Sequence, residues 1–70
     1  MRPLNAKQLI KILKDNGFIL SRQKGSHMIF RDSQTNATVP VPFHGKSKPI
    51  YIGTFLAIIK QSKLPKDKFK

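Results

Sequence analysis

Cysteine and glutamate are absent from this 70-residue chain, and its acidic side chains are three aspartates, Asp15, Asp32 and Asp67. The lack of cysteine excludes a disulfide-stabilised scaffold, a cysteine-ligated zinc site and thiol catalysis. Folding must therefore depend on one small apolar core, and we expect a single domain spanning residues 1–70. The functional groups of so small a domain should lie on its surface or in a shallow groove.

Long hydrophobic runs are missing as well. No apolar stretch approaches the ~20 residues needed to cross a bilayer, and residues 1–5 lack the apolar segment of a signal peptide. We therefore expect a cytoplasmic protein that does not bind membranes. The two histidines and three aspartates are too dispersed for a recognisable metal-ligand spacing, so we expect no metal and no other cofactor.

Positive charge dominates the residues that are present. Fourteen lysines and arginines oppose the three aspartates, which gives a formal net charge of +11 at pH 7. Such a balance favours a polyanionic partner, and a phosphate backbone offers regularly spaced charge that lysine and arginine bind with release of counterions. Nucleic acid is the first partner to consider, although an anionic membrane surface or an acidic protein would satisfy the same charge.

The first periodic segment predicts a helix over residues 6–16, because its apolar residues recur at helical spacing. Asn5 and Gln8 form a capping-box pattern at its start, in which each side chain bonds the other residue's backbone N–H. Asn16 and Gly17 provide the stop, since glycine tolerates the left-handed conformation at a helix end.

The hydrophobic period then changes, which predicts three short antiparallel strands over 18–22, 26–31 and 37–41, joined by turns at 23–25 and 32–36. Alternation in the second strand places Met28 and Phe30 on the face toward the core. The opposite face carries a candidate site, with His27, Ile29 and Arg31.

The third strand contains Pro40 and Pro42, which cannot donate to a ladder, so we expect it either at a sheet edge or paired through the alternate residues Val39 and Val41 only. A second helix follows an exposed loop at about 53–61, with an apolar face of Phe55, Leu56, Ile58 and Ile59. A short terminal helix at 64–69 should fray with the chain end. The predicted fold is therefore α+β, with the order α-β-β-β-α. Both helices should cover one sheet face and leave the other open.

Several motifs carry a family resemblance: residues 9–18, Arg22-Gln23-Lys24-Gly25-Ser26-His27, Val39-Pro40-Val41-Pro42-Phe43-His44, and Gly53-Thr54-Phe55 followed by residues 58–61. With them the chain resembles, nearly end to end, the HicA toxin family, the small mRNA-cleaving partners in bacterial HicA–HicB toxin–antitoxin pairs. The resemblance implies a fold like the double-stranded-RNA-binding domain. It places the family's catalytic histidine at His27.

The resemblance also implies a biological role and a partner. The chain would be the toxin of a type II toxin–antitoxin pair, an endoribonuclease that cleaves mRNA to block translation. A HicB-like antitoxin would mask His27 and present acidic groups to the basic face. We expect the unbound toxin to be a monomer and any higher assembly to come from the antitoxin.

The chemistry of His27 can be derived from the residue type. Metal-independent RNA cleavage removes a proton from a 2′-hydroxyl, lets that oxygen attack the adjacent phosphate, and protonates the departing 5′-oxygen. An imidazole can perform either proton transfer at neutral pH, so His27 is the candidate general acid or base. His44 is the candidate for the second role, with a lysine or water as the alternative.

The candidates for RNA binding or phosphate stabilisation are Lys24, Gly25, Ser26, Arg31 and the loop residue Lys46. Two other functions stay open on the sequence alone. One is a non-catalytic RNA-binding module that uses the same basic sheet face. The other is an interaction domain whose charge serves an acidic protein, with His27 as an ordinary hydrogen-bonded strand histidine.

Overall fold

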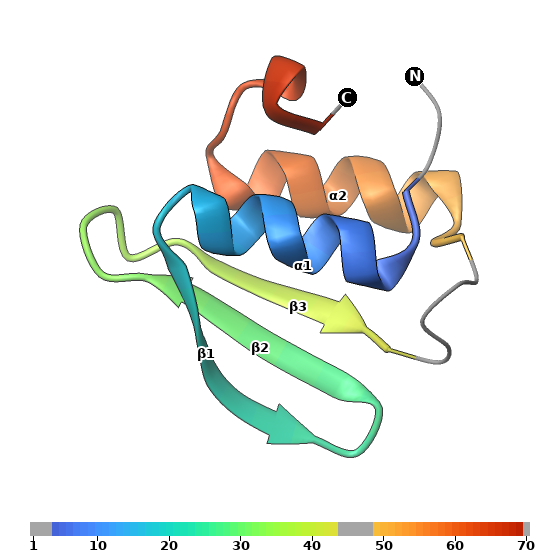
Figure 1. Cartoon of the computed structure of the whole chain (residues 1–70), viewed down its shortest axis with the longest axis horizontal. Helices are drawn as coiled ribbons and strands as arrows, with labels where there is room; N and C mark the ends of the chain where they lie inside the picture. Colours follow the sequence, from blue (N-terminus) through green and yellow to red (C-terminus); the bar gives the residue numbers. More distant parts are fainter. Residues whose placement is uncertain (1–3, 44–48, 70) are drawn as a thin grey trace.

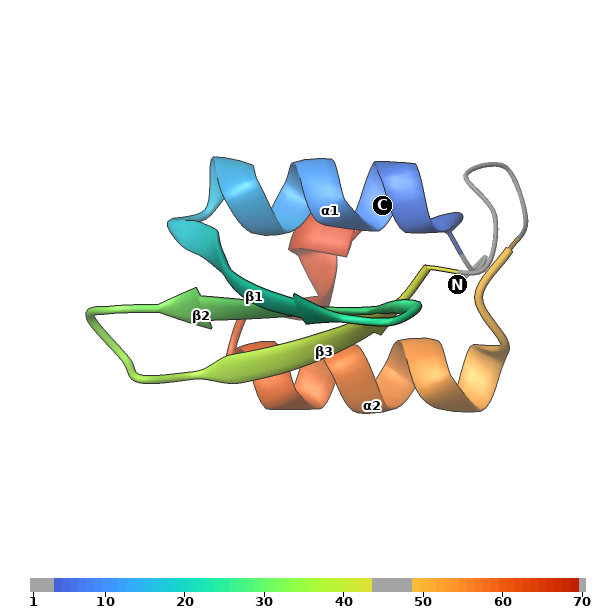
Figure 2. The ribbon, with the colours of Figure 1, turned by 90° about the horizontal axis from the view of Figure 1, so that it is seen from below.

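The structure is a computed structural model that describes residues 4–43 and 49–69 of the chain. Its elements are α1 (Ala6–Asp15), β1 (Phe18–Lys24), β2 (His27–Asp32), β3 (Thr38–Pro42), α2 (Ile52–Ser62) and the 3-10 helix η1 (Lys66–Phe69). Both α-helices lie on the same side of a three-stranded antiparallel sheet (Figure 1). In the view from below, the sheet lies in front of the helices, so that its strands appear between α1 and α2 (Figure 2). The predicted α+β class and the double-stranded-RNA-binding-domain order are confirmed.

A capping box starts α1, as the sequence predicts. The Gln8 N–H donates to Asn5 Oδ1 at 2.8 Å, and the Asn5 N–H donates to Gln8 Oε1 at 3.1 Å. These two bonds satisfy donors that a helix N-terminus otherwise leaves without partners. The first helix therefore begins at a position that its own side chains define.

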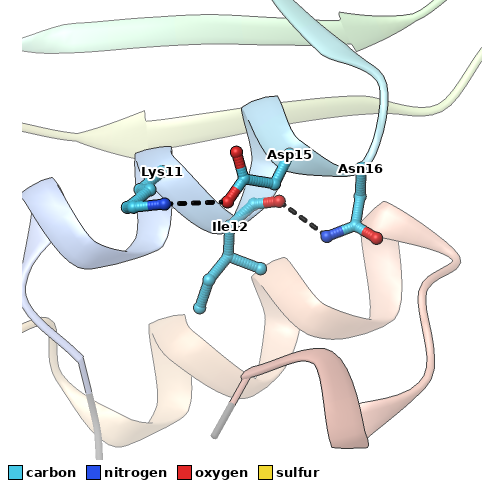
Figure 3. A network of polar contacts seen from close by, with 4 residues as sticks. All are labelled: Lys11, Ile12, Asp15 and Asn16. Atoms are coloured by element: carbon cyan, nitrogen blue, oxygen red, sulfur yellow. Dashed lines mark hydrogen bonds and ion pairs between the residues drawn. The ribbon is translucent and has the colours of Figure 1, made fainter.

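Polar contacts also define the end of α1 (Figure 3). The Asn16 side-chain amide donates to the Ile12 carbonyl at 2.7 Å, and Lys11 pairs with Asp15 at 3.0 Å across one helical turn. Gly17 follows with a φ of 95°, a conformation that glycine adopts without steric cost. The helix thus stops at Asp15, one residue before the predicted end.

The first hairpin differs from the prediction in its turn. Lys24 belongs to β1 and pairs with His27, and the turn consists of Gly25 and Ser26 alone. Gly25 has a φ of 59° and occupies the position where type II′ turns place glycine. Because two residues are enough to reverse the chain, Lys24 remains in the strand instead of the turn.

The sheet order is β1-β2-β3, so β3 lies at an edge as its prolines predict. One face of the sheet packs against the helices. The buried residues of this core face and of the helices include Phe18, Phe30, Val39, Val41, Leu9, Leu13, Phe55, Ile58 and Ile59. Phe30 is fully buried and Met28 is partly buried against the same cluster, which confirms the predicted core pair.

The C-terminal part corrects two predictions. Leu56 is 43% exposed and therefore does not belong to the apolar face that α2 buries. The chain end forms a 3-10 turn that does not fray, because Phe69 is fully buried and packs edge-on against Phe55 with ring centroids 6.2 Å apart. Aromatic burial outweighs the tendency of a terminus to fray.

The end of α2 provides a test of backbone strain. Lys63 ends the helix with a φ of 61°, a left-handed conformation in which any Cβ costs about 1 kcal/mol. Lys63→Gly should therefore stabilise the fold by about 1 kcal/mol and raise the melting temperature by about 5 °C. Lys63→Ala is the control, because it also loses the long 3.4 Å contact from the Lys63 ammonium to the Thr35 carbonyl but keeps the Cβ. Equal thermal unfolding curves for the two variants would contradict this account.

Candidate nucleic-acid interface

The sheet face that turns away from the helices carries the candidate site. Cross-strand partners in an antiparallel sheet share a face, and the register therefore assigns nine residues to this surface, which we call the open face: Ile19, Arg22, Lys24, His27, Ile29, Arg31, Thr38, Pro40 and Pro42. All of them are exposed except Ile29 and Pro42, which are partly buried. The predicted separation of His27 from the core pair is confirmed.

His27 is the first residue of β2 and is exposed. Its cross-strand partners are Lys24 in β1 and Pro42 in β3. Opposed Cβ atoms in such pairs lie about 5 Å apart, so the Lys24 ammonium can reach any group bound at the imidazole. The β1–β2 hairpin therefore places the His27 imidazole beside the Lys24 ammonium.

The turn next to His27 is accessible at Gly25 and is held by a backbone hydrogen bond at Ser26. A Cβ placed on Gly25 would meet no atom within 4 Å, so the backbone there is accessible to a bulky ligand. The Ser26 carbonyl accepts a 2.6 Å hydrogen bond from the Phe43 N–H, which ties the end of β3 to the turn. The structure thus brings together Lys24, Gly25, Ser26 and His27, four of the predicted site residues.

Two predicted residues, His44 and Lys46, lie outside the described residues. The described chain stops at Phe43, beside Ser26, and resumes at Pro49, after which the Ile50 N–H donates to the Leu4 carbonyl at 3.1 Å. The acid–base pairing of His44 with His27 therefore stays a prediction.

Arg31 shares the open face with His27 but lies four residues farther along β2. At the rise of an antiparallel strand this separates the two Cα atoms by about 13 Å. The Arg31 guanidinium donates to Asn36 Oδ1 at 3.0 Å, and Asn36 lies in the turn between β2 and β3. The structure therefore does not bring Arg31 to the imidazole, and its role toward phosphate stays a prediction at a neighbouring position.

Arg22 is a residue of the open face that the sequence analysis did not single out as a site residue. The register shifts between Leu20 and Arg22, so Ser21 is an extra residue in β1. Regular alternation from Phe18 would turn Arg22 toward the core, and the bulge reverses this parity. The pairing of Arg22 with Ile29 places it one cross-strand row from His27. The sequence did carry one sign of the bulge, because regular alternation from Phe18 would have buried the charged side chain of Arg22.

Among residues 4–43 and 49–69, no aspartate side chain lies on the open face. Asp15 lies on α1 and pairs with Lys11, and Asp67 lies in η1. Asp32 is buried on the core face, where its carboxylate accepts from the Gln34 N–H at 3.0 Å and the Thr35 hydroxyl at 3.3 Å. Since these are the chain's three acidic side chains, the cations of the open face make it a positively charged surface.

The described residues contain no group of three or more histidine, cysteine, aspartate or glutamate side chains that would hold a metal ion. The open face therefore carries one imidazole, one ammonium, two guanidiniums, one hydroxyl and four apolar side chains. Such a surface can bind phosphates and can transfer a proton at one position.

The turn at Gly25 generates a test of what positions Lys24 beside His27. Gly25→Ala adds a Cβ at a φ of 59° with no neighbour to clash, so it should destabilise the fold by about 1 kcal/mol through backbone conformation alone. Gly53→Ala is the matched control, because it also meets no atom within 4 Å but lies in the first turn of α2. It should stabilise by up to about 1 kcal/mol. Urea unfolding measures both, and shifts of the same sign would contradict the argument.

Comparison with known proteins agrees with this geometry. The family model described as the HicA toxin of bacterial toxin–antitoxin systems matches residues 6–64, which cover α1, the whole sheet and α2. A search of curated proteins gave no significant match. None of the helices in the described ranges is long and apolar enough to cross a membrane. The matched segment covers most of the chain, and the protein belongs to the HicA toxin family of bacterial toxin–antitoxin systems.

Proposed function

We propose that this toxin is a metal-independent endoribonuclease that cleaves mRNA and thereby blocks translation in the cytoplasm. The observation that carries the proposal is the placement of His27, an exposed imidazole opposite Lys24 on a cationic sheet face without carboxylates. Membership of a toxin family gives a reason for an activity that harms the cell.

The proposed reaction is transesterification within the RNA chain. The 2′-oxygen loses its proton and forms a bond to the adjacent phosphorus, while the bond from phosphorus to the 5′-oxygen breaks and that oxygen takes up a proton. The products are a 2′,3′-cyclic phosphate and a 5′-hydroxyl. His27 performs one of the two proton transfers, and His44, a lysine or water performs the other.

Lys24 is the proposed partner of the reacting phosphate. Charge accumulates on the non-bridging oxygens as the 2′-oxygen attacks, and an ammonium already held beside the imidazole stabilises that charge without reorganising. The backbone N–H groups of Gly25 and Ser26 lie at the same turn, where the absence of a Cβ on Gly25 lets a phosphate approach closely.

Toxin–antitoxin membership implies an antitoxin partner for this chain. We propose a HicB-like protein that covers His27 and sets acidic side chains against Lys24 and Arg22. Opposite fields would speed association, and contacts with the apolar residues of the open face would lengthen the lifetime of the complex. The unbound toxin is proposed to be a monomer.

A non-catalytic RNA-binding module is the second candidate function. The observation that favours it is that the three cations of the open face, Lys24, Arg22 and Arg31, are sufficient to bind phosphates whether or not His27 transfers a proton. In that case the open face holds RNA without cutting it.

The test compares the parent with His27→Ala on a long mRNA in the presence of EDTA. We expect fragments with cyclic phosphate ends from the parent, at least a hundredfold slower cleavage by the variant, and RNA affinity within about threefold, because general acid–base catalysis contributes about 10²–10⁴-fold while phosphate binding depends on the cations. Growth arrest on expression should follow cleavage.

Gln61→Ala, an exposed change on α2, serves as the control and should cleave like the parent. If the parent binds RNA tightly but leaves it intact, the second candidate function replaces the first. Cleavage that persists in His27→Ala would remove the imidazole from the mechanism.

A further inference from the structure

The open face is ordered in cross-strand rows, and each row contains one permanent cation. The three rows are Lys24, His27 and Pro42; then Arg22, Ile29 and Pro40; then Ile19, Arg31 and Thr38. Lys24 and Arg22 come from β1, and Arg31 comes from β2. Successive rows are two residues apart along β2 and β3, which corresponds to about 7 Å, and the bulge at Ser21 adds one residue to the step from Arg22 to Ile19 in β1.

This spacing is similar to the separation of successive phosphates in an extended single strand. A nucleic-acid backbone carries one charge per nucleotide, so a line of cations at one per row matches it without any specific base contact. A peptide does not carry a negative charge at each step unless its sequence is uniformly acidic. The regular spacing therefore favours RNA over an acidic protein as the ligand of this line.

The bulge at Ser21 is the second observation. A bulge leaves its extra residue unpaired and interrupts the ladder, so it has a structural cost. Here it allows Phe18 to face the core while Arg22 and Lys24, later in the same strand, both face the side of His27. Bulges commonly re-aim side chains in this way beside functional sites.

We propose that Arg22 binds the phosphate next to the one that is cleaved at His27, so that single-stranded RNA lies along β1 and β2 with its backbone over Lys24, Arg22 and Arg31. The proposal rests on the proposed ribonuclease function and adds the path of the substrate. A guanidinium suits this position because it can donate two parallel hydrogen bonds to one phosphate. Ile29 and Pro40, in the same row, offer apolar surface to the base of that nucleotide.

The bulge and the cations of β1 also have a purely structural interpretation. Edge strands often carry charged residues and bulges that prevent pairing with another chain. Under that interpretation Arg22 contributes no more to RNA cleavage than any other exposed cation of the protein. A variant with the same loss of charge on another surface separates the two interpretations.

The experiment measures kcat/KM on a short single-stranded RNA with one mapped cleavage position. Arg22→Gln is compared with Lys14→Gln, which removes one exposed positive charge from α1 on the helical side. We expect Arg22→Gln to lower kcat/KM roughly tenfold and Lys14→Gln to lower it less than about twofold, since a charge-assisted bond contributes more than a distant screened charge. Circular dichroism and thermal unfolding confirm that both variants are folded.

The decisive comparison uses RNA in which single phosphates beside the cleavage position are replaced by neutral methylphosphonates. One neighbouring replacement should slow the parent roughly tenfold and slow Arg22→Gln no further, because the bond is already lost. Two outcomes would overturn the assignment of Arg22 while leaving the ribonuclease function intact. One is that the methylphosphonate lowers kcat/KM of Arg22→Gln as much as it lowers that of the parent. The other is that Arg22→Gln and Lys14→Gln lower kcat/KM equally. So would a loss of antitoxin binding by Arg22→Gln without any effect on RNA.

If the parent does not cleave, the proposed function fails separately. The affinity of the parent for the same RNA, with and without each methylphosphonate, then tests Arg22 alone. Arg22→Gln should reduce the slope of log K against log salt by about 0.7, the value for one phosphate contact on a single strand. An unchanged slope would overturn the proposal.

Discussion

The antiparallel pairing of β1 with β2 around Gly25 is the constraint on which the rest of the molecule depends. It decides which side chains enter the core and which form the open face. A regular hairpin would impose one alternation on the whole of β1, and Phe18 and Lys24 would then share a face. The bulge at Ser21 removes this conflict, so one short strand serves both the core and the candidate site.

The core face of the sheet requires apolar side chains, whereas the open face carries cations, and the two kinds of residue lie on opposite faces. The core face has one buried acid, Asp32 at the end of β2, whose carboxylate accepts hydrogen bonds from the turn that follows the strand. The open face has no acid, and its cations repel one another until a polyanion binds. Binding of the proposed RNA substrate or of the proposed acidic antitoxin would relieve this repulsion. Ionic strength should weaken both interactions.

Much of this fold could be predicted from the sequence, because its signals are local. The capping box of Asn5 and Gln8, the stop at Gly17 and the alternation in β2 each follow from a few neighbouring residues. The position of Arg22 was missed, because an extra residue in one strand changes which face a side chain takes without changing composition, and its one local sign is a charged residue at an expected core-facing position. Lys63 was also missed, since a lysine in the left-handed conformation has no sequence signal. Within the candidate site, the closeness of His27 and Lys24 could be predicted from the hairpin. The distance between His27 and Arg31 could be judged only from the strand register.

The proposed reaction at His27 depends on attack by a 2′-hydroxyl of the RNA bound to the open face. The most direct test is cleavage of two RNA oligonucleotides that differ in one atom, the second having a 2′-deoxy sugar on the 5′ side of the mapped cleavage position. If the 2′-oxygen is the attacking group, cleavage at that position disappears in the second oligonucleotide while binding is retained. Undiminished cleavage at the deoxy position would contradict the account, because the attacking oxygen would then come from elsewhere.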